Sequence, residues 1–255
     1  MTDIHMHILP GVDDGAADWY DAMEMAQIAA DNGVSAIVAT PHCNIPGYCK
    51  NYAGESLEVL LKTARAMLKQ EKIEVNLYAG MEVFATPQVP WLIQRGLLWP
   101  VNGGHYMLIE FSEKEDPVFA EGLLAQIREL GILPVIAHPE RYAFVQEDLC
   151  TVGAWKSRGY GIQVNRGSLQ GRFGKEAFKT AHRLLRLQLA DVIASDAHSP
   201  YVRTPNLAEA YAELAELYPE EYIRLLMREN PSRICMDKPL LCTEKTFCGK
   251  AGRKV

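Results

Sequence analysis

Two histidines stand two residues apart near the start of the chain, in the run DIHMH at residues 3–7. On a β-strand, residues i and i+2 point to the same face, so His5 and His7 would direct two imidazoles at one point. Neutral imidazole is the commonest protein ligand for borderline divalent metals. The pair alone is equally compatible with two surface histidines.

Histidines and carboxylates recur where other apolar runs end. SAIVAT is followed by Pro-His, MLIE ends in glutamate, LPVIAH ends in histidine, and DVIAS is followed by Asp-Ala-His. A carboxylate beside a buried strand is costly to leave unpaired, and a metal cation is an economical partner. Glu82 follows the predicted strand at 75–80, in the run Ala-Gly-Met-Glu. The candidate residues are thus His42, Glu82, Glu110, His138, Asp196 and His198.

The loop after DIHMH carries a pair of adjacent acids, Asp13 and Asp14, followed by Gly15. Asp and Gly are common in turns that lead into helices, which is the structural interpretation. The functional interpretation is that one of the two carboxylates faces the metal site.

The apolar runs alternate with amphipathic stretches along the chain, which predicts parallel strands joined by crossover helices. About seven such units favour a single-domain α/β barrel or distorted barrel, with a doubly wound sheet as the alternative. Asn230-Pro231 is expected to end the last long helix. The predicted strands span 3–8, 35–40, 75–80, 106–111, 133–137, 161–165 and 192–195, and the predicted helices 18–31, 57–70, 117–130, 175–187, 207–218 and 220–228.

In a barrel, the carboxyl ends of the strands meet on one face, where active sites form. The candidate ligands would then converge. They are too many for one tetrahedral zinc and suit two or three divalent cations with bridging carboxylates. Such cations lower the pKa of bound water, so the sequence predicts metal-dependent hydrolysis.

Arginines follow two of the candidate ligands. Arg141 comes three residues after His138, and Arg203 five residues after His198. A guanidinium matches phosphate bidentately, and surface salt bridges are the alternative interpretation. The remaining basic side chains are weaker candidates: Arg166 is of the same type, whereas His105 and His182 lie off the strand ends and are expected to be structural or exposed.

The chain has 255 residues, a net charge of −6, 48% hydrophobic and 23% charged residues, which are ordinary values for a globular protein. The acidic balance argues against a general nucleic-acid binder. The chain shows no signal-peptide pattern and no apolar run long enough for membrane insertion, so a cytoplasmic protein with six reduced cysteines is expected. No cysteine is followed by Arg after five residues, which excludes a cysteine-dependent phosphatase. We expect one domain at 1–242 and a short basic, poorly ordered tail at 243–255.

In chain order, the motifs DIHMHILPGVDDG, TPH, LIEF, AHPERY and SDAH resemble the polymerase and histidinol phosphatase (PHP) superfamily. Within it, they are most similar to the bacterial manganese-dependent protein-tyrosine phosphatases of capsule and exopolysaccharide operons. The resemblance covers roughly residues 1–240 and implies a distorted, TIM-like (β/α)7 barrel with a trinuclear centre. Manganese would be the metal, with iron and zinc as alternatives.

The resemblance also implies individual roles. Asp14 is chosen over Asp13 because the family's aspartate precedes glycine, and Arg141 and Arg203 match the family's phosphate-contacting arginines. Position by position, the first metal would be held by His5, His7, Glu82 and Asp196, the second by Glu82, Glu110 and His138, and the third by Asp14, His42 and His198.

The implied reaction is attack of a metal-bridging hydroxide on phosphotyrosine, in the C-terminal tail of a bacterial tyrosine autokinase that controls polysaccharide export. One alternative keeps the metals but takes a small phosphate monoester such as histidinol phosphate, or a nucleic-acid phosphodiester, which the net charge disfavours. Another is a non-catalytic, metal-binding regulator of the kinase, against which the complete ligand set argues.

Overall fold

The computed structural model describes residues 1–242, and the predicted tail at 243–255 lies outside the described residues. Every ladder in this part is parallel, as predicted, and the strands form two sheets with the orders β1-β2-β4 and β3-β5-β6-β7-β8-β9. The strands are β1 (Thr2–Met6), β2 (Ala36–Ala39), β3 (His42–Cys43), β4 (Asn76–Ala79), β5 (Glu82–Phe84), β6 (Tyr106–Glu110), β7 (Leu133–Ala137), β8 (Gly161–Asn165) and β9 (Val192–Ala194).

The two sheets are joined through two interrupted strands. β2 and β3 are separated by Thr40-Pro41, and β4 and β5 by Gly80-Met81. Pro41 has no N–H for a ladder, and a Cβ on Gly80 would lie 2.6 Å from a methyl of Val38. Because β2 pairs with β4 and β3 with β5, the two breaks lie side by side. Taking each broken pair as one strand leaves the seven strand units that the sequence predicts.

The first and last strands meet without a ladder between them in the described residues. Met6 forms a single parallel bridge with Ala197. His7 N donates to Ala197 O at 2.9 Å, and Asp196 N donates to His5 O at 2.9 Å. The predicted α/β fold is confirmed, and this irregular junction is where it departs from a regular barrel.

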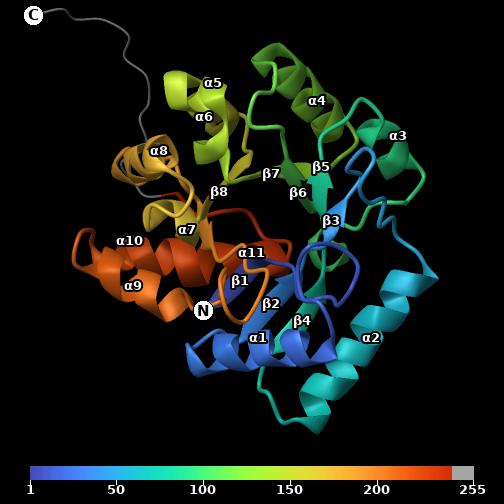
Figure 1. Cartoon of the computed structure of the whole chain (residues 1–255). Coiled ribbons are helices and arrows are strands. Elements are labelled where there is room, and N and C mark those ends of the chain that lie inside the picture. Colours follow the sequence, from blue (N-terminus) through green and yellow to red (C-terminus); the bar gives the residue numbers. More distant parts are fainter. Residues whose placement is uncertain (243–255) are drawn as a thin grey trace, which may run out of the picture.

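Helices lie outside the strands (Figure 1). For example, α2 packs on β4, α4 on β7 and α6 on β8. Asp18 caps the first helix: its side chain accepts a hydrogen bond from Asp21 N at 3.0 Å. The helices are α1 (Trp19–Asp31), α2 (Glu55–Gln70), α3 (Val89–Gln94), α4 (Pro117–Glu129), α5 (Ala143–Glu147), α6 (Cys150–Ser157), α7 (Arg166–Leu169), α8 (Lys175–Arg186), α9 (Leu207–Ala215), α10 (Glu220–Arg224) and α11 (Asn230–Cys235).

The prediction that Asn230-Pro231 ends the last long helix is wrong. The chain runs from α10 through the π-turn η3 (Leu225–Glu229) directly into α11, which places Pro231 in the first turn of α11. Proline is tolerated there, and the wide π-turn accommodates its missing N–H. The buried Asn230 side chain donates to Asp191 O and Leu241 O, both at 3.1 Å.

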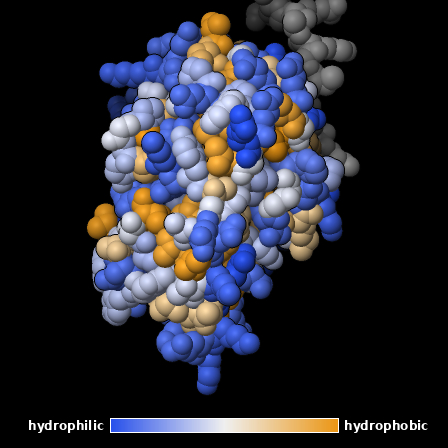
Figure 2. Space-filling model, turned by 90° about the vertical axis from the view of Figure 1, so that its right-hand side faces the viewer, coloured by the Kyte–Doolittle hydropathy of each residue, from blue (hydrophilic) through white to orange (hydrophobic). Residues whose placement is uncertain are grey.

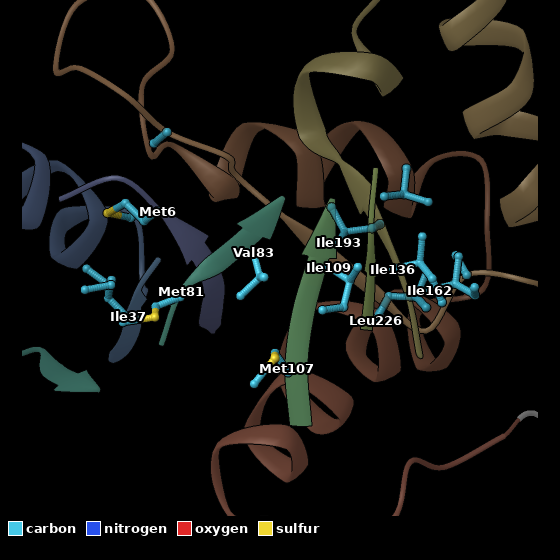
Figure 3. Packing of buried hydrophobic residues seen from close by; sticks show 14 of the residues in the cluster. Met6, Ile37, Met81, Val83, Met107, Ile109, Ile136, Ile162, Ile193 and Leu226 are labelled. Atoms are coloured by element: carbon cyan, nitrogen blue, oxygen red, sulfur yellow. The ribbon is translucent and has the colours of Figure 1, made fainter. Parts of the chain in front are cut away.

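The strands are buried on both faces, as their continuous apolar runs predict. Figure 3 shows Ile109, Ile136, Ile162 and Ile193, which come from β6, β7, β8 and β9 and belong to the larger core cluster that includes helix residues. Alternate positions such as Leu108, Val135 and Val192 form a second, smaller cluster with Ile234 of α11. The residues of this second cluster point to the same side of the strands as the polar residues nearer the carboxyl ends. Those polar residues are Glu110, Gln163, Asn165 and Asp196.

The surface matches the globular composition. On the face in Figure 2, apolar side chains form small patches between polar ones. Among residues 1–242, no helix is long and apolar enough to cross a membrane.

Candidate metal centre

All nine predicted ligands lie in one cluster at the carboxyl ends of the strands. They form overlapping groups whose donor atoms lie within 4.8 Å of one another. Glu82 is central: its Oε2 lies 3.2 Å from both His5 Nε2 and His7 Nε2, and its Oε1 lies 2.9 Å from His138 Nε2. The groups are His7–Asp14–His42–His198, His5–His7–Asp196, His5–Glu82–His138 and His42–Glu82–Glu110.

The two N-terminal histidines point to one place, as strand alternation predicts. Their Nε2 atoms lie 3.3 Å apart, and both side chains are fully buried. They are therefore not surface residues.

The adjacent acids of the DDG run have different environments. Asp14 reaches the cluster, with Oδ1 3.4 Å from His42 Nε2 and 3.5 Å from His198 Nε2. Asp13 instead accepts hydrogen bonds from His42 N and Gly15 N and lies 2.8 Å from His7 Nδ1. A carboxylate on Nδ1 holds a histidine with its Nε2 free for a metal. Asp14 is the candidate ligand, and Asp13 orients His7.

Gly15 lets this loop approach β1. A Cβ at position 15 would lie 2.3 Å from His7 O and 2.4 Å from His7 Cβ, so the loop must move if any side chain is added there. We expect Gly15→Ala to displace Asp13 and Asp14 and to weaken Mn²⁺ binding by about 10- to 100-fold, as loss of ligand-orienting contacts does elsewhere. Titration of metal-free protein measures this. The control is Gly122→Ala, where the added methyl meets nothing within 4 Å; equal losses in both variants would contradict the prediction.

Two ligands that were expected to close strands instead begin new ones. His42 and Glu82 are the first residues of β3 and β5 and are paired neighbours across that ladder. The strand breaks before them thus set two candidate ligands side by side. Two other ligands have left-handed backbone, with φ of 32° at His138 and 51° at Asp196. Such conformations are strained for these residues and are typical of functional sites.

The charges of the cluster shift its pKa values strongly. Burial disfavours the imidazolium of His5, but Glu82 and Asp196 outweigh it and raise the pKa of His5 to about 9. Burial is likewise outweighed at His7, where Asp13 and Glu82 raise the pKa to about 10. Burial and the neighbouring Glu82 raise the pKa of Glu110 to about 8. Without metal, the cluster therefore holds extra protons at neutral pH.

Several buried atoms of the cluster have no hydrogen bond within the described part of the chain, among them His42 Nδ1, Glu82 Oε2 and His198 Nε2. An unsatisfied buried polar atom costs about 1–3 kcal/mol. Divalent cations would satisfy these atoms, and mixed imidazole and carboxylate donors suit manganese, iron or zinc. The residues fit a metal centre, and the overlapping groups fit more than one ion.

Both predicted arginines lie at the cluster and share an aromatic contact. Arg203 pairs with Asp196, and Arg141 lies 2.9 Å from Glu113 Oε1. Their guanidinium carbons lie 5.4 and 4.8 Å from the centre of the Phe173 ring. Loops after β7, β8 and β9 therefore gather both cations around one ring.

The weaker candidates have structural environments, as expected. Arg166 is buried and donates to Thr204 at 3.5 Å and to Asn206 O at 2.5 Å. His105 is exposed and lies 2.6 Å from Asp237, and His182 contacts Leu169 O at 3.2 Å.

Three residues at this site were not predicted from the sequence, namely Gln163, Asn165 and Phe173. The two amides occupy inward positions of the predicted strand GIQVN, where a polar residue between apolar neighbours is itself a signal. For Phe173, no local pattern indicates that two arginines would pack on it.

Fold and cluster together define a class: a TIM-like α/β protein with a candidate multinuclear metal centre on the carboxyl-end face. The family model described as "Capsular polysaccharide synthesis, CpsB/CapC" matches residues 1–236. The chain therefore belongs to the CpsB/CapC family, which confirms the resemblance found in the sequence.

Named relatives agree with this assignment. Tyrosine-protein phosphatase YwqE from Bacillus subtilis is 34% identical over 230 residues, which cover 90% of this chain and 89% of the relative. A solved structure from work on YwqE and on CpsB of Streptococcus pneumoniae, described as unique metal-dependent tyrosine phosphatases, gives a TM-score of 0.89 at 32% identity, over 96% of this chain and 98% of the other. Histidinol phosphate phosphatase from Lactococcus lactis shares the fold alone, with a TM-score of 0.53 at 11% identity over 89% of this chain and 94% of the other.

Proposed function

We propose that this chain is a metal-dependent tyrosine phosphatase. The observation that carries the proposal is the convergence of nine candidate ligands with two arginines on one face of the fold. The relatives named above support phosphotyrosine as the substrate.

The proposed ligands are those inferred from the sequence: His5, His7, Asp14, His42, Glu82, Glu110, His138, Asp196 and His198. Bound divalent cations would supply a water of lowered pKa and neutralise charge on the phosphoryl group. The guanidinium groups of Arg141 and Arg203 would orient the phosphoryl group. Arg203 Nε is buried and has no hydrogen-bond partner among residues 1–242, so it is free to donate to a phosphoryl oxygen. Arg141, which contacts the same Phe173 ring, would bind the same group.

The proposal extends to two or three metal ions, most simply Mn²⁺, and to the C-terminal tail of a bacterial tyrosine autokinase as substrate. The four overlapping donor groups support more than one ion, and the family's link to capsular polysaccharide synthesis supports the substrate. A cytoplasmic location is proposed because the five cysteines within residues 1–242 are all free thiols.

Metal analysis paired with turnover tests the function. We expect two to three metals per chain, phosphotyrosine-peptide hydrolysis that is lost on chelation and restored by Mn²⁺, and much slower hydrolysis of histidinol phosphate. Faster hydrolysis of histidinol phosphate would overturn phosphotyrosine as the proposed substrate. Full activity in chelated, metal-free protein would overturn the metal requirement. If the protein binds metal but hydrolyses neither ester, the alternative of a non-catalytic, metal-binding regulator of the kinase would be favoured.

We expect Arg203→Ala to lower kcat/KM by about 100- to 1,000-fold, the usual cost of losing one donor to the transition state. The kinetics are compared at saturating Mn²⁺, because Arg203 also pairs with the candidate ligand Asp196 and its loss is expected to weaken metal binding as well. Arg224→Ala is the control, since Arg224 ends α10 and pairs at 2.9 Å with Glu229 of η3. Unchanged kinetics in Arg203→Ala would assign this residue a purely structural role.

A further inference from the structure

Three hydrogen bonds link two candidate ligands beneath the cluster. His5 Nδ1 lies 3.0 Å from Gln163 Oε1, Gln163 Nε2 donates to Asn165 Oδ1 at 2.8 Å, and Asn165 Nδ2 donates to Asp196 Oδ2 at 2.5 Å. None of the four side chains is more than 2% exposed. We call this series the β8 amide relay, because β8 supplies both amides.

The direction of the relay follows from its two ends. Near one end, His138 N can only donate, and it lies 3.4 Å from Gln163 Oε1, which places the amide oxygen on that side. At the other end, the ionised Asp196 carboxylate can only accept, so the Asn165 NH2 must face it. Both ends thus require the same amide orientations, and His5 carries its proton on Nδ1.

Packing alone does not account for two amides here. Gln163 and Asn165 are two residues apart on β8 and point into the interior, where the neighbouring strands carry apolar residues such as Val135 and Val192. Buried amides cost free energy unless every polar atom is bonded. Every side-chain polar atom of these two residues is bonded.

We propose that Gln163 and Asn165 are positioning residues of the metal centre. With its proton held on Nδ1 by Gln163, His5 keeps the Nε2 lone pair facing the cluster. Asn165 and Arg203 hold Asp196 Oδ2, so Oδ1 is the oxygen that faces His5 Nε2 at 3.4 Å. The relay thus fixes one donor atom on each of two ligands, on β1 and after β9. This inference rests on the proposed metal centre.

Metal affinity, measured without turnover, tests the relay. Gln163→Met and Asn165→Leu keep side-chain size and remove the polar atoms. We expect each to weaken Mn²⁺ binding by metal-free protein about 10- to 100-fold, measured from the electron paramagnetic resonance signal of free Mn²⁺. Gln163→Glu, which still accepts from His5, should bind more tightly than Gln163→Met.

The matched control is Asn230→Leu. Asn230 is as fully buried as Asn165, but its side chain bonds backbone oxygens of Asp191 and Leu241, away from the cluster. We expect Gln163→Met, Asn165→Leu and Asn230→Leu all to lose thermal stability, and only the first two to lose metal affinity. Wild-type affinity in folded relay variants, or an equal loss in Asn230→Leu, would overturn the relay.

The histidine tautomer provides a second measurement that needs no variant. In wild-type protein loaded with Zn²⁺, nitrogen-15 spectra should show His5 protonated at Nδ1, with slow solvent exchange. A proton on Nε2 would overturn the relay even if the variants failed to fold. Failure of the wild-type chain to bind either metal would instead overturn the metal centre of the proposed function.

Discussion

Glu82→Gln is expected to lower kcat/KM for a phosphotyrosine peptide by at least about 1,000-fold, or about 4 kcal/mol at 1.4 kcal/mol per factor of ten. Both oxygens of Glu82 contact histidines of the cluster closely: Oε2 lies 3.0 to 3.2 Å from His5, His7 and His42, and Oε1 lies 2.9 Å from His138. The two oxygens of Glu110 are more distant, each 3.7 Å from a histidine nitrogen. An amide keeps the shape but removes the charge and one acceptor. Fewer bound metals are therefore expected.

Elemental analysis, steady-state kinetics and thermal unfolding of the same preparation check this prediction. Glu176→Gln is the control, since Glu176 is an exposed acid on α8 that pairs with Lys179. If Glu82→Gln proves unstable, Glu82→Asp keeps the charge and should retain more metal than the amide variant. Wild-type kcat/KM and metal content in a folded Glu82→Gln protein would remove Glu82 from the centre.

Much of this site follows from local rules. The period of two along a strand predicts that His5 and His7 converge, and the parallel topology predicts that residues after different strands meet on one face. Both rules act over a few residues or follow from element order alone. For that reason seven strand units and nine clustered side chains could be predicted before any distance was known.

What could not be predicted depends on contacts between distant segments. Asp13 and Asp14 are adjacent and chemically identical, so only the family resemblance could favour Asp14 as the ligand. The hydrogen bonds that Asp13 makes to His7 and His42 were not predictable. The shared contact of Arg141 and Arg203 with Phe173 joins loops after three different strands. The continuation of the helix past Pro231 depends on a π-turn that no residue pattern announces.

The strand breaks lie between these two cases. Pro41 and Gly80 are visible in the sequence as residues that weaken a ladder. That both breaks fall at the same level, and so begin β3 and β5 side by side, depends on the pairing register. This register pairs His42 with Glu82 in the β3–β5 ladder. If the strands ended at residues 40 and 80, as predicted, the two residues would lie in loops and would not be paired.

Metal binding should tighten steeply as pH rises, because bound metal excludes protons that the metal-free cluster holds. The pKa values of His5, His7 and Glu110 are raised to about 9, 10 and 8. At pH 7 all three groups are protonated without metal, so binding should release up to three protons. Each released proton makes the affinity about tenfold greater per pH unit. Mn²⁺ affinity should therefore rise about 100- to 1,000-fold from pH 6.5 to 7.5 and flatten as these groups lose their protons.

The stability of the metal-free protein should fall as pH rises, whereas metal affinity increases. Because the folded-state pKa of His5 and His7 lies above the ordinary value of 6.5, their stabilising contribution is present below pH 6.5 and is lost as pH rises through about 9 to 10. Thermal unfolding of chelated protein should thus move to lower temperature over this range, whereas metal-loaded protein should not follow it.

Calorimetry at pH 7 in two buffers of different ionisation enthalpy counts the released protons. His7→Gln should release about one fewer than wild type, and His105→Gln, which alters an exposed histidine outside the cluster, should release the same number. An affinity independent of pH, or equal proton release in His7→Gln, would mean that metal binds elsewhere. Because the count measures which groups lose protons on binding, it locates the metals without relying on turnover.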